Sequence, residues 1–133
     1  MKKMIPKFRA WDKRENTMRD VAVLHFTKGG KVNSIEYWKI PSELKSYHVR
    51  NLVLMQSTGL KDKNGVEIFE GDVLYYIPFE SHINDSIVVF EKGSFCKKML
   101  RNGKLTSVKF IDSEEYEVIG NVWDNPELLE GTE

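Results

Sequence analysis

Residues 54–74 read LMQSTGLKDKNGVEIFEGDVL and are the most informative stretch of the sequence. It begins as a run that is typical of a strand and reaches a turn at Asn64-Gly65, a pair that tolerates the positive φ of a tight hairpin. Gly71-Asp72 predicts a second reversal of the chain. There glycine supplies a backbone conformation that other residues avoid, and the short aspartate accepts backbone N–H bonds. The stretch therefore predicts two turns and the strands that they join.

Short strands separated by turns also describe the rest of the chain. Gly29-Gly30 lies between two β-rich runs and predicts an N-terminal hairpin. Pro41-Ser42-Glu43-Leu44-Lys45 interrupts the alternation, and we expect a single helical turn to begin there. Strands are expected at residues 7–11, 18–26, 32–40, 51–57, 73–79, 87–90, 105–111 and 116–123. The pattern predicts a mainly β (β-rich α+β) fold: a small SH3-like barrel or sandwich of short antiparallel strands with an additional N-terminal hairpin.

The length and composition are those of one soluble domain. The chain has 133 residues, of which 41% are hydrophobic and 30% charged, enough to bury a core without disulfides. We expect a single domain over residues 1–133, with a β-hairpin portion over about residues 1–50 and a β-barrel-like portion over about residues 51–133. The one cysteine, Cys96, cannot form an internal disulfide. No apolar window approaches the roughly 20 residues of a membrane span, so we expect a cytoplasmic protein without membrane contact.

The net charge of zero hides an asymmetry between the two halves of the chain. Residues 1–66 contain 14 Lys/Arg and 6 Asp/Glu, a net charge of +8, and residues 67–133 contain 6 and 14, a net charge of −8. One interpretation is a basic face for nucleic acid or another anionic partner. The other is that the two halves, or neighbouring subunits, complement each other's charge. The basic residues are scattered singly among apolar ones, which favours the second interpretation.

No motif indicates a catalytic, cofactor or metal site. The three histidines His25, His48 and His82 lie far apart in the sequence, without the spacing of zinc ligands. Asp20 with Glu43-Leu44-Lys45 matches the D…ExK pattern of metal-dependent nucleases, but that pattern requires ExK on a strand, where we expect a helical turn. We therefore assign no catalytic, cofactor-binding or metal-ligating residue, and expect no cofactor.

Glu67, Glu70 and Asp72 form the tightest acidic group. Carboxylates in this arrangement can hold a divalent cation, which prefers oxygen ligands. The structural interpretation is favoured, because short aspartate side chains stabilise turns through backbone hydrogen bonds. The residues assigned to structural turns are Asn64, Gly65, Gly71 and Asp72.

Two pairs of adjacent aromatic residues, Tyr37-Trp38 and Tyr75-Tyr76, fall in expected strands. Successive side chains of a strand point to opposite faces, so the two members of a pair cannot enter the same core. One member of each pair must be exposed or lie at an interface. The candidate interface residues are therefore Tyr37, Trp38, Tyr75 and Tyr76.

Three segments together resemble the YopX family of phage and prophage proteins. They are KFRAWD at residues 7–12, the stretch at residues 54–74, and YEVIGNVWDNPELLE at residues 116–130. The resemblance covers the whole chain and leaves the regions between the segments free to vary. It implies a small, mainly β protein of phage origin that is expressed in a bacterial cytoplasm and assembles with copies of itself. It implies no catalytic residue.

These observations predict a non-enzymatic accessory protein of phage or prophage origin. We expect it to act through protein–protein contact, as a homo-oligomer or with a host or phage protein. The alternative is nucleic-acid binding through the basic N-terminal half, whose affinity would fall steeply with salt. A metal-dependent nuclease is the third interpretation.

Overall fold

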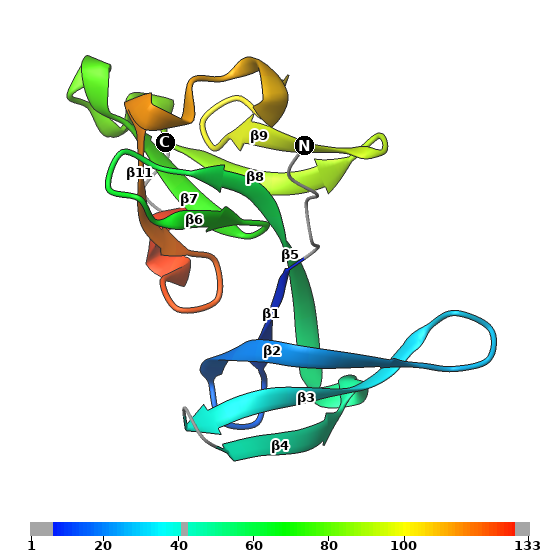
Figure 1. The fold of residues 1–133 in the computed structure, drawn as a ribbon. Helices are drawn as coiled ribbons and strands as arrows, with labels where there is room; N and C mark the ends of the chain where they lie inside the picture. Colours follow the sequence, from blue (N-terminus) through cyan, green and yellow to red (C-terminus); the bar gives the residue numbers. More distant parts are fainter. Residues whose placement is uncertain (1–6, 41–42, 130–133) are drawn as a thin grey trace. The chain divides into compact units, whose positions relative to one another are not determined.

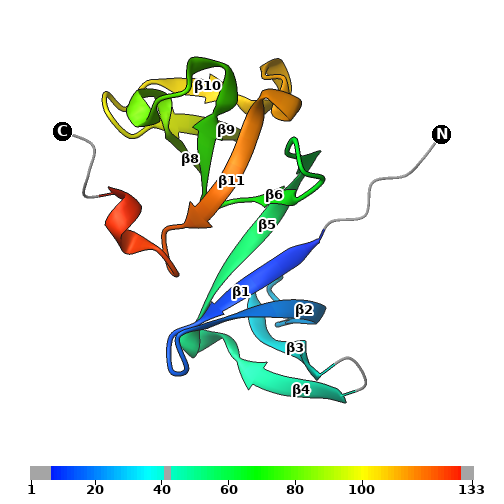
Figure 2. The same ribbon diagram turned by 90° about the vertical axis from the view of Figure 1, so that its left-hand side faces the viewer.

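The computed structural model describes residues 7–40 and 43–129, whose strands form two antiparallel sheets (Figures 1 and 2). Strands account for 57% of these residues and helices for 16%. The helices are 3-10 turns of three or four residues, and in the described ranges none has the length or the apolar character of a membrane span. The mainly β class is confirmed.

The first sheet has six strands in the order β4-β3-β2-β1-β5-β6. Every neighbouring pair is antiparallel, and η1 (Val49–Asn51) separates β4 from β5. The strands are β1 (Phe8–Asp12), β2 (Thr17–Phe26), β3 (Val32–Ile40), β4 (Glu43–His48), β5 (Leu52–Lys61) and β6 (Glu67–Phe69). Figure 1 shows β2, β3 and β4 side by side, with β4 at one edge.

The second sheet has five strands in the order β10-β9-β8-β7-β11. They are β7 (Asp72–Tyr76), β8 (Ser86–Glu91), β9 (Ser94–Met99), β10 (Leu105–Ser107) and β11 (Tyr116–Asn121). The connections contain the turns η2 (Ile77–Phe79), η3 (His82–Asn84), η4 (Val108–Phe110) and η5 (Ser113–Glu115), and η6 (Pro126–Leu129) follows β11. Both sheets are open, and the described strands close no barrel.

The predicted turn at Gly29-Gly30 is confirmed, and the predicted helical turn at residues 43–45 is wrong. β2 and β3 pair as a hairpin around residues 27–31, as the Gly-Gly pair predicted. Glu43-Leu44-Lys45, predicted to be helical, lies in β4 and pairs with β3 along its length. Backbone pairing with a neighbouring strand outweighs the local preference of a short segment. Residues 41 and 42 lie outside the described residues.

The described residues divide within β5 into two compact units, at residues 7–56 (the first unit) and 57–129 (the second unit). Each unit has its own buried cluster. The first contains Ala10, Ile35, Tyr37 and Leu52, and the second contains Ile68, Leu74, Val88 and Tyr116. The predicted barrel is absent from the described residues, because both sheets are open, and the single domain over residues 1–133 stays a prediction.

Buried aspartates stabilise both turns of the stretch at residues 54–74. Asp62 Oδ1 accepts hydrogen bonds from the N–H groups of Asn64 (2.8 Å) and Val66 (2.9 Å), and its Oδ2 accepts one from Val118 N–H (2.9 Å) in β11. The Asp62 carbonyl accepts a further bond from Gly65 N–H (3.0 Å). Asp62 therefore holds its own turn and joins it to a strand that follows 56 residues later.

The second turn is built around Gly71 and Asp72. Gly71 has φ of +90°, in the region that favours glycine. Asp72 is 1% exposed, and its Oδ2 accepts a hydrogen bond from Phe69 N–H at 2.8 Å. Glu67, of the same acidic group, accepts a hydrogen bond from the Ser57 hydroxyl.

Candidate interaction surfaces

The register of β2, β3 and β4 sorts their side chains onto two faces. Residues that lie directly opposite each other in an antiparallel sheet share a face, and neighbours along a strand point to opposite faces. Val21, Tyr37 and Lys45 form one cross-strand row, so they lie on one face, which we call the inner face. Trp38 and Leu44, each one residue along from that row, pair on the opposite face, the outer face.

The inner face is the core of the first unit. Ile35 is 0% exposed and Tyr37 is 3% exposed. The Tyr37 ring lies 6.2 Å from the Tyr47 ring, and the Arg19 guanidinium lies 4.7 Å from its centre. Arg19 in turn forms an ion pair with the fully buried Asp12 at 3.3 Å. Tyr37, a candidate interface residue, is therefore a core residue.

The outer face exposes large apolar side chains. Trp38 is 45% exposed, Leu44 is 41% exposed and Val23 is 38% exposed. Val23 pairs with Glu36, two residues from Trp38, which places it on the same face. His25 and Glu36 also meet there, with His25 Nε2 and Glu36 Oε2 separated by 2.8 Å. Among the described residues β4 is an edge strand of its sheet, so an edge without a partner strand lies next to these apolar side chains.

The second aromatic pair has different surroundings. The Tyr75 ring lies 4.9 Å from the His82 ring of η3, and the Tyr76 ring lies 5.2 Å from the Tyr116 ring of β11. Both tyrosines are half-buried. Burial raises the pKa of the Tyr116 hydroxyl, and the neighbouring Tyr76 raises it further. Both candidate interface residues of this pair therefore contact side chains of their own unit.

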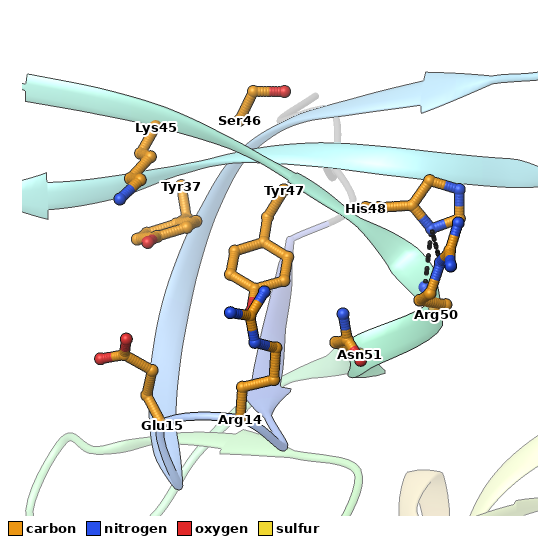
Figure 3. Close-up of a pocket in the computed structure, with 9 residues that line it drawn as sticks. All are labelled: Arg14, Glu15, Tyr37, Lys45, Ser46, Tyr47, His48, Arg50 and Asn51. Atoms are coloured by element: carbon orange, nitrogen blue, oxygen red, sulfur yellow. Dashed lines mark hydrogen bonds between the residues drawn. The ribbon is translucent and has the colours of Figure 1, made fainter.

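A hollow opens in the first unit beside the end of β4 (Figure 3). Arg14 and Glu15 come from the turn between β1 and β2, and Arg50 comes from η1. The volume is about 510 Å³. We call it the basic hollow; it is lined by Arg14, Glu15, Tyr37, Lys45, Ser46, Tyr47, His48, Arg50 and Asn51. Figure 3 shows the side chains of Arg14 and Tyr47 close together, whereas Ser46 points away from them.

Contacts within the first unit fix several of these side chains. The Arg14 guanidinium carbon lies 5.8 Å from the centre of the Tyr47 ring, and that ring packs against the core cluster. His48 Nδ1 accepts hydrogen bonds from the backbone N–H of Arg50 (3.1 Å) and from its Nε (3.4 Å). The cation–π contact of Arg14 with Tyr47 and the packing of Tyr47 against the core are both favourable. They hold this wall of the hollow in place.

The basic hollow carries a net positive charge. Arg14, Lys45 and Arg50 face one carboxylate, Glu15, which lies 3.5 Å from Arg19. Among residues 7–40 and 43–129, none of the three cations forms an ion pair. Residues 7–56 as a whole contain 10 Lys/Arg and 5 Asp/Glu. The hollow therefore presents unneutralised cations and one aromatic wall, a combination that suits an anionic ligand with a planar group.

The D…ExK residues do not come together, although ExK does lie on a strand. Asp20 precedes Val21 and so lies on the outer face, whereas Lys45 lies on the inner face. A shared metal site would need the carboxylates and the lysine on one side of the sheet. The part of the chain that the structure describes contains no cluster of three His, Cys, Asp or Glu side chains at metal-binding distance.

The histidines serve separate local contacts. His25 meets Glu36, His48 caps η1, and His82 Nδ1 lies 2.8 Å from Asp85 Oδ2. Burial raises the pKa of the Asp85 carboxyl, and the hydrogen bond and charge of His82 oppose that rise.

Sequence reasoning did not find the basic hollow or the role of Asp62. The turn residues Asp62 and Asn64 carry a local signal, since Asp commonly accepts N–H bonds two residues on. No local sequence signal marks the hollow, because its walls come from the β1–β2 turn, β3, β4 and η1.

Comparison with known proteins identifies a family and two similar solved structures. The family model described as YopX protein matches residues 7–130. Protein EF1440 from Enterococcus faecalis, known from a crystal structure, is 33% identical and has a TM-score of 0.69, with 96% of this chain and 99% of that chain covered. Protein YopX from Bacillus subtilis is 23% identical and has a TM-score of 0.62, with 92% and 96% covered, and shares the fold. No curated protein matches the chain.

Proposed function

The chain belongs to the YopX protein family, and from this we propose that it is a phage- or prophage-encoded accessory protein that acts by macromolecular contact rather than by catalysis. The phage origin rests on the three family segments. We place the protein in the cytoplasm of the bacterial host, where its one cysteine, Cys96, stays reduced. Its principal activity is self-assembly into a homo-oligomer through the outer face of the first unit.

One observation carries this proposal: Trp38 and Leu44 lie opposite each other in register, and both are more than a third exposed on the solvent side of a sheet. Val23 extends the apolar surface across the neighbouring strand. Burial of such side chains against a second copy contributes about 25 cal/mol per Å² of apolar surface. Clustered exposed apolar side chains are typical of protein–protein contact sites.

The edge strand β4 adds polar contacts to the same surface. An edge strand presents backbone N–H and C=O groups without a partner strand, and these can pair with a strand of another copy. A symmetric antiparallel pairing of β4 with β4 would extend the sheet across the two copies and place their outer faces side by side on one continuous surface.

Sedimentation velocity over a range of protein concentrations tests the proposal. We expect the wild-type chain to have a mass above that of the 15.5 kDa monomer, and Trp38→Glu and Leu44→Glu to shift it to the monomer. Phe110→Glu is the matched control, since Phe110 is 77% exposed in η4 of the second unit. A wild-type chain that stays monomeric at every concentration, or equal dissociation by Phe110→Glu, would refute self-assembly through the outer face.

A further inference from the structure

We infer that the basic hollow binds single-stranded nucleic acid, with backbone phosphates on Arg14, Lys45 and Arg50 and a base stacked at the Tyr47 wall. The site lies beside the inner face, on side chains that the self-assembly surface does not use. The inference therefore goes beyond the proposed function and does not depend on it.

The three cations come from separate elements that line the hollow. Arg14 comes from the β1–β2 turn, Lys45 from β4 and Arg50 from η1, so they surround the hollow instead of following one strand. Guanidinium groups bind phosphate through two parallel hydrogen bonds, and lysine adds a point charge. Because no described carboxylate forms an ion pair with these three side chains, a phosphate would not have to displace one.

The carboxylate of Glu15 is the one opposing charge in the wall. It lies at the rim, 3.5 Å from the Arg19 guanidinium, which also holds Asp12. Arg19 therefore offsets part of the Glu15 charge, and the hollow keeps a surplus of positive charge. This surplus favours an anionic ligand over a neutral one.

The Tyr47 ring and the Arg14 guanidinium that lies over it together supply a stacking surface. The Tyr47 ring is held by the core cluster and by the Tyr37 ring at 6.2 Å, and the Arg14 guanidinium lies 5.8 Å from its centre. Nucleic-acid bases stack on aromatic rings and on guanidinium planes alike. A volume of about 510 Å³ lies within the range of sites that hold one small ligand, which is the size of a single nucleotide.

A single strand fits this arrangement better than a duplex does. The bases of a duplex are already stacked on one another, so a duplex can offer the hollow only its phosphates. A single strand can place both a phosphate and an unstacked base in the same hollow. We therefore expect the protein to prefer a single strand over a duplex of the same sequence.

Fluorescence anisotropy of the full chain with a labelled oligothymidylate of about 20 nucleotides tests the inference. Affinity should fall with salt, and the double variant Arg14→Ala/Lys45→Ala should flatten the plot of log K against log salt by about 1.4, at about 0.7 per lost phosphate contact on a single strand. The matched control is Lys28→Ala/Lys31→Ala, which removes the same charge from the β2–β3 turn of the same unit. We expect the control to change the slope by less than about 0.5.

Stacking is tested at Tyr47. Tyr47→Leu should weaken binding about tenfold, whereas Tyr47→Phe, which keeps the ring, should bind as the wild type does. Circular dichroism of each variant establishes that it is folded, and Tyr47→Phe keeps the test valid if Tyr47→Leu does not fold.

Three results would overturn the inference: no binding of the oligonucleotide at low salt, equal loss of affinity in the control variant, or equal affinity for the duplex. Trp38→Glu separates this inference from self-assembly. A variant that is monomeric and still binds the oligonucleotide supports the hollow alone, and an oligomeric wild type that binds no oligonucleotide supports self-assembly alone.

Discussion

The aromatic pairs Tyr37-Trp38 and Tyr75-Tyr76 obey the same strand alternation and end in different surroundings. In the first pair one ring is buried at 3% exposure and its neighbour is 45% exposed. In the second pair both rings are half-buried, against His82 and Tyr116. Alternation fixes which way a side chain points, but segments elsewhere in the chain decide whether anything covers it.

This difference shows which of the two pairs contains a side chain that is available for contact with a second copy. η3 places a histidine ring on Tyr75, so the second pair is covered within its own unit. No comparable contact of the Trp38 ring is found among the described residues. The first pair therefore combines a core residue with a surface residue, and only its surface member is suited to self-assembly.

The largest expected effect is at Tyr37. Tyr37→Ala should lower the free energy of unfolding by about 3 kcal/mol or more, because it leaves a cavity beneath Arg19 and beside Tyr47. Urea denaturation measures this change, and Tyr37→Phe is the control that keeps the ring. A loss below about 1 kcal/mol would mean that Tyr37 is not part of the core.

The second pair should show coupling between Tyr76 and Tyr116. Their rings lie 5.2 Å apart, and contacting aromatic rings contribute about 0.5–1.5 kcal/mol beyond burial. A double-mutant cycle with Tyr76→Leu, Tyr116→Leu and the double variant measures the coupling in urea denaturation. Additive effects of the two substitutions would show that the contact contributes nothing of its own.

The free energy of unfolding should depend on pH through Asp85. This carboxylate contacts His82, whose ring covers Tyr75. Burial raises the folded-state pKa of the Asp85 carboxyl, although His82 opposes the rise. The resulting contribution to stability is fully present below the ordinary Asp pKa of about 3.9 and is lost as pH rises through the raised value.

Asp85→Asn cannot ionise, so the stability of this variant relative to the wild type should increase as pH rises across that acidic range. Thermal denaturation at a series of pH values measures the difference. A difference that is flat or that decreases with pH would contradict the raised pKa.

The smallest expected effect is at Trp38. In dilute solution, Trp38→Ala should change the free energy of unfolding by no more than about 0.5 kcal/mol, because the side chain is nearly half exposed and lies outside the core cluster. Urea denaturation at the lowest practical concentration measures it. A loss as large as that of Tyr37→Ala would remove the distinction between the two faces.

The parts of the fold that depend on local signals were predictable. Asn64-Gly65 and Gly29-Gly30 mark turns through the conformations that their own residues tolerate, and both segments turn where expected. Glu43-Leu44-Lys45 was not predictable, because its strand forms only by pairing with β3. The second carboxylate oxygen of Asp62 reaches Val118, a contact across 56 residues for which no local pattern exists.

The candidate surfaces likewise have some features that a local pattern predicts and others that depend on distant segments. Alternation alone predicts that Tyr37 and Trp38 point to opposite faces, whereas the contacts that cover Tyr37 and Tyr75 depend on other segments of the chain. The basic hollow forms only where the β1–β2 turn, β3, β4 and η1 meet, and the basic residues scattered along the sequence did not indicate it.

Amide hydrogen exchange at two edge strands tests whether β4 and the outer face form the self-assembly surface. β4 (Glu43–His48) and β10 (Leu105–Ser107) are each the last strand of a sheet. If the outer face and β4 form the self-assembly surface, the protection of β4 amides should increase with protein concentration while that of β10 stays constant, and Trp38→Glu should abolish the increase. Protection of β4 that does not change with concentration would contradict the claim.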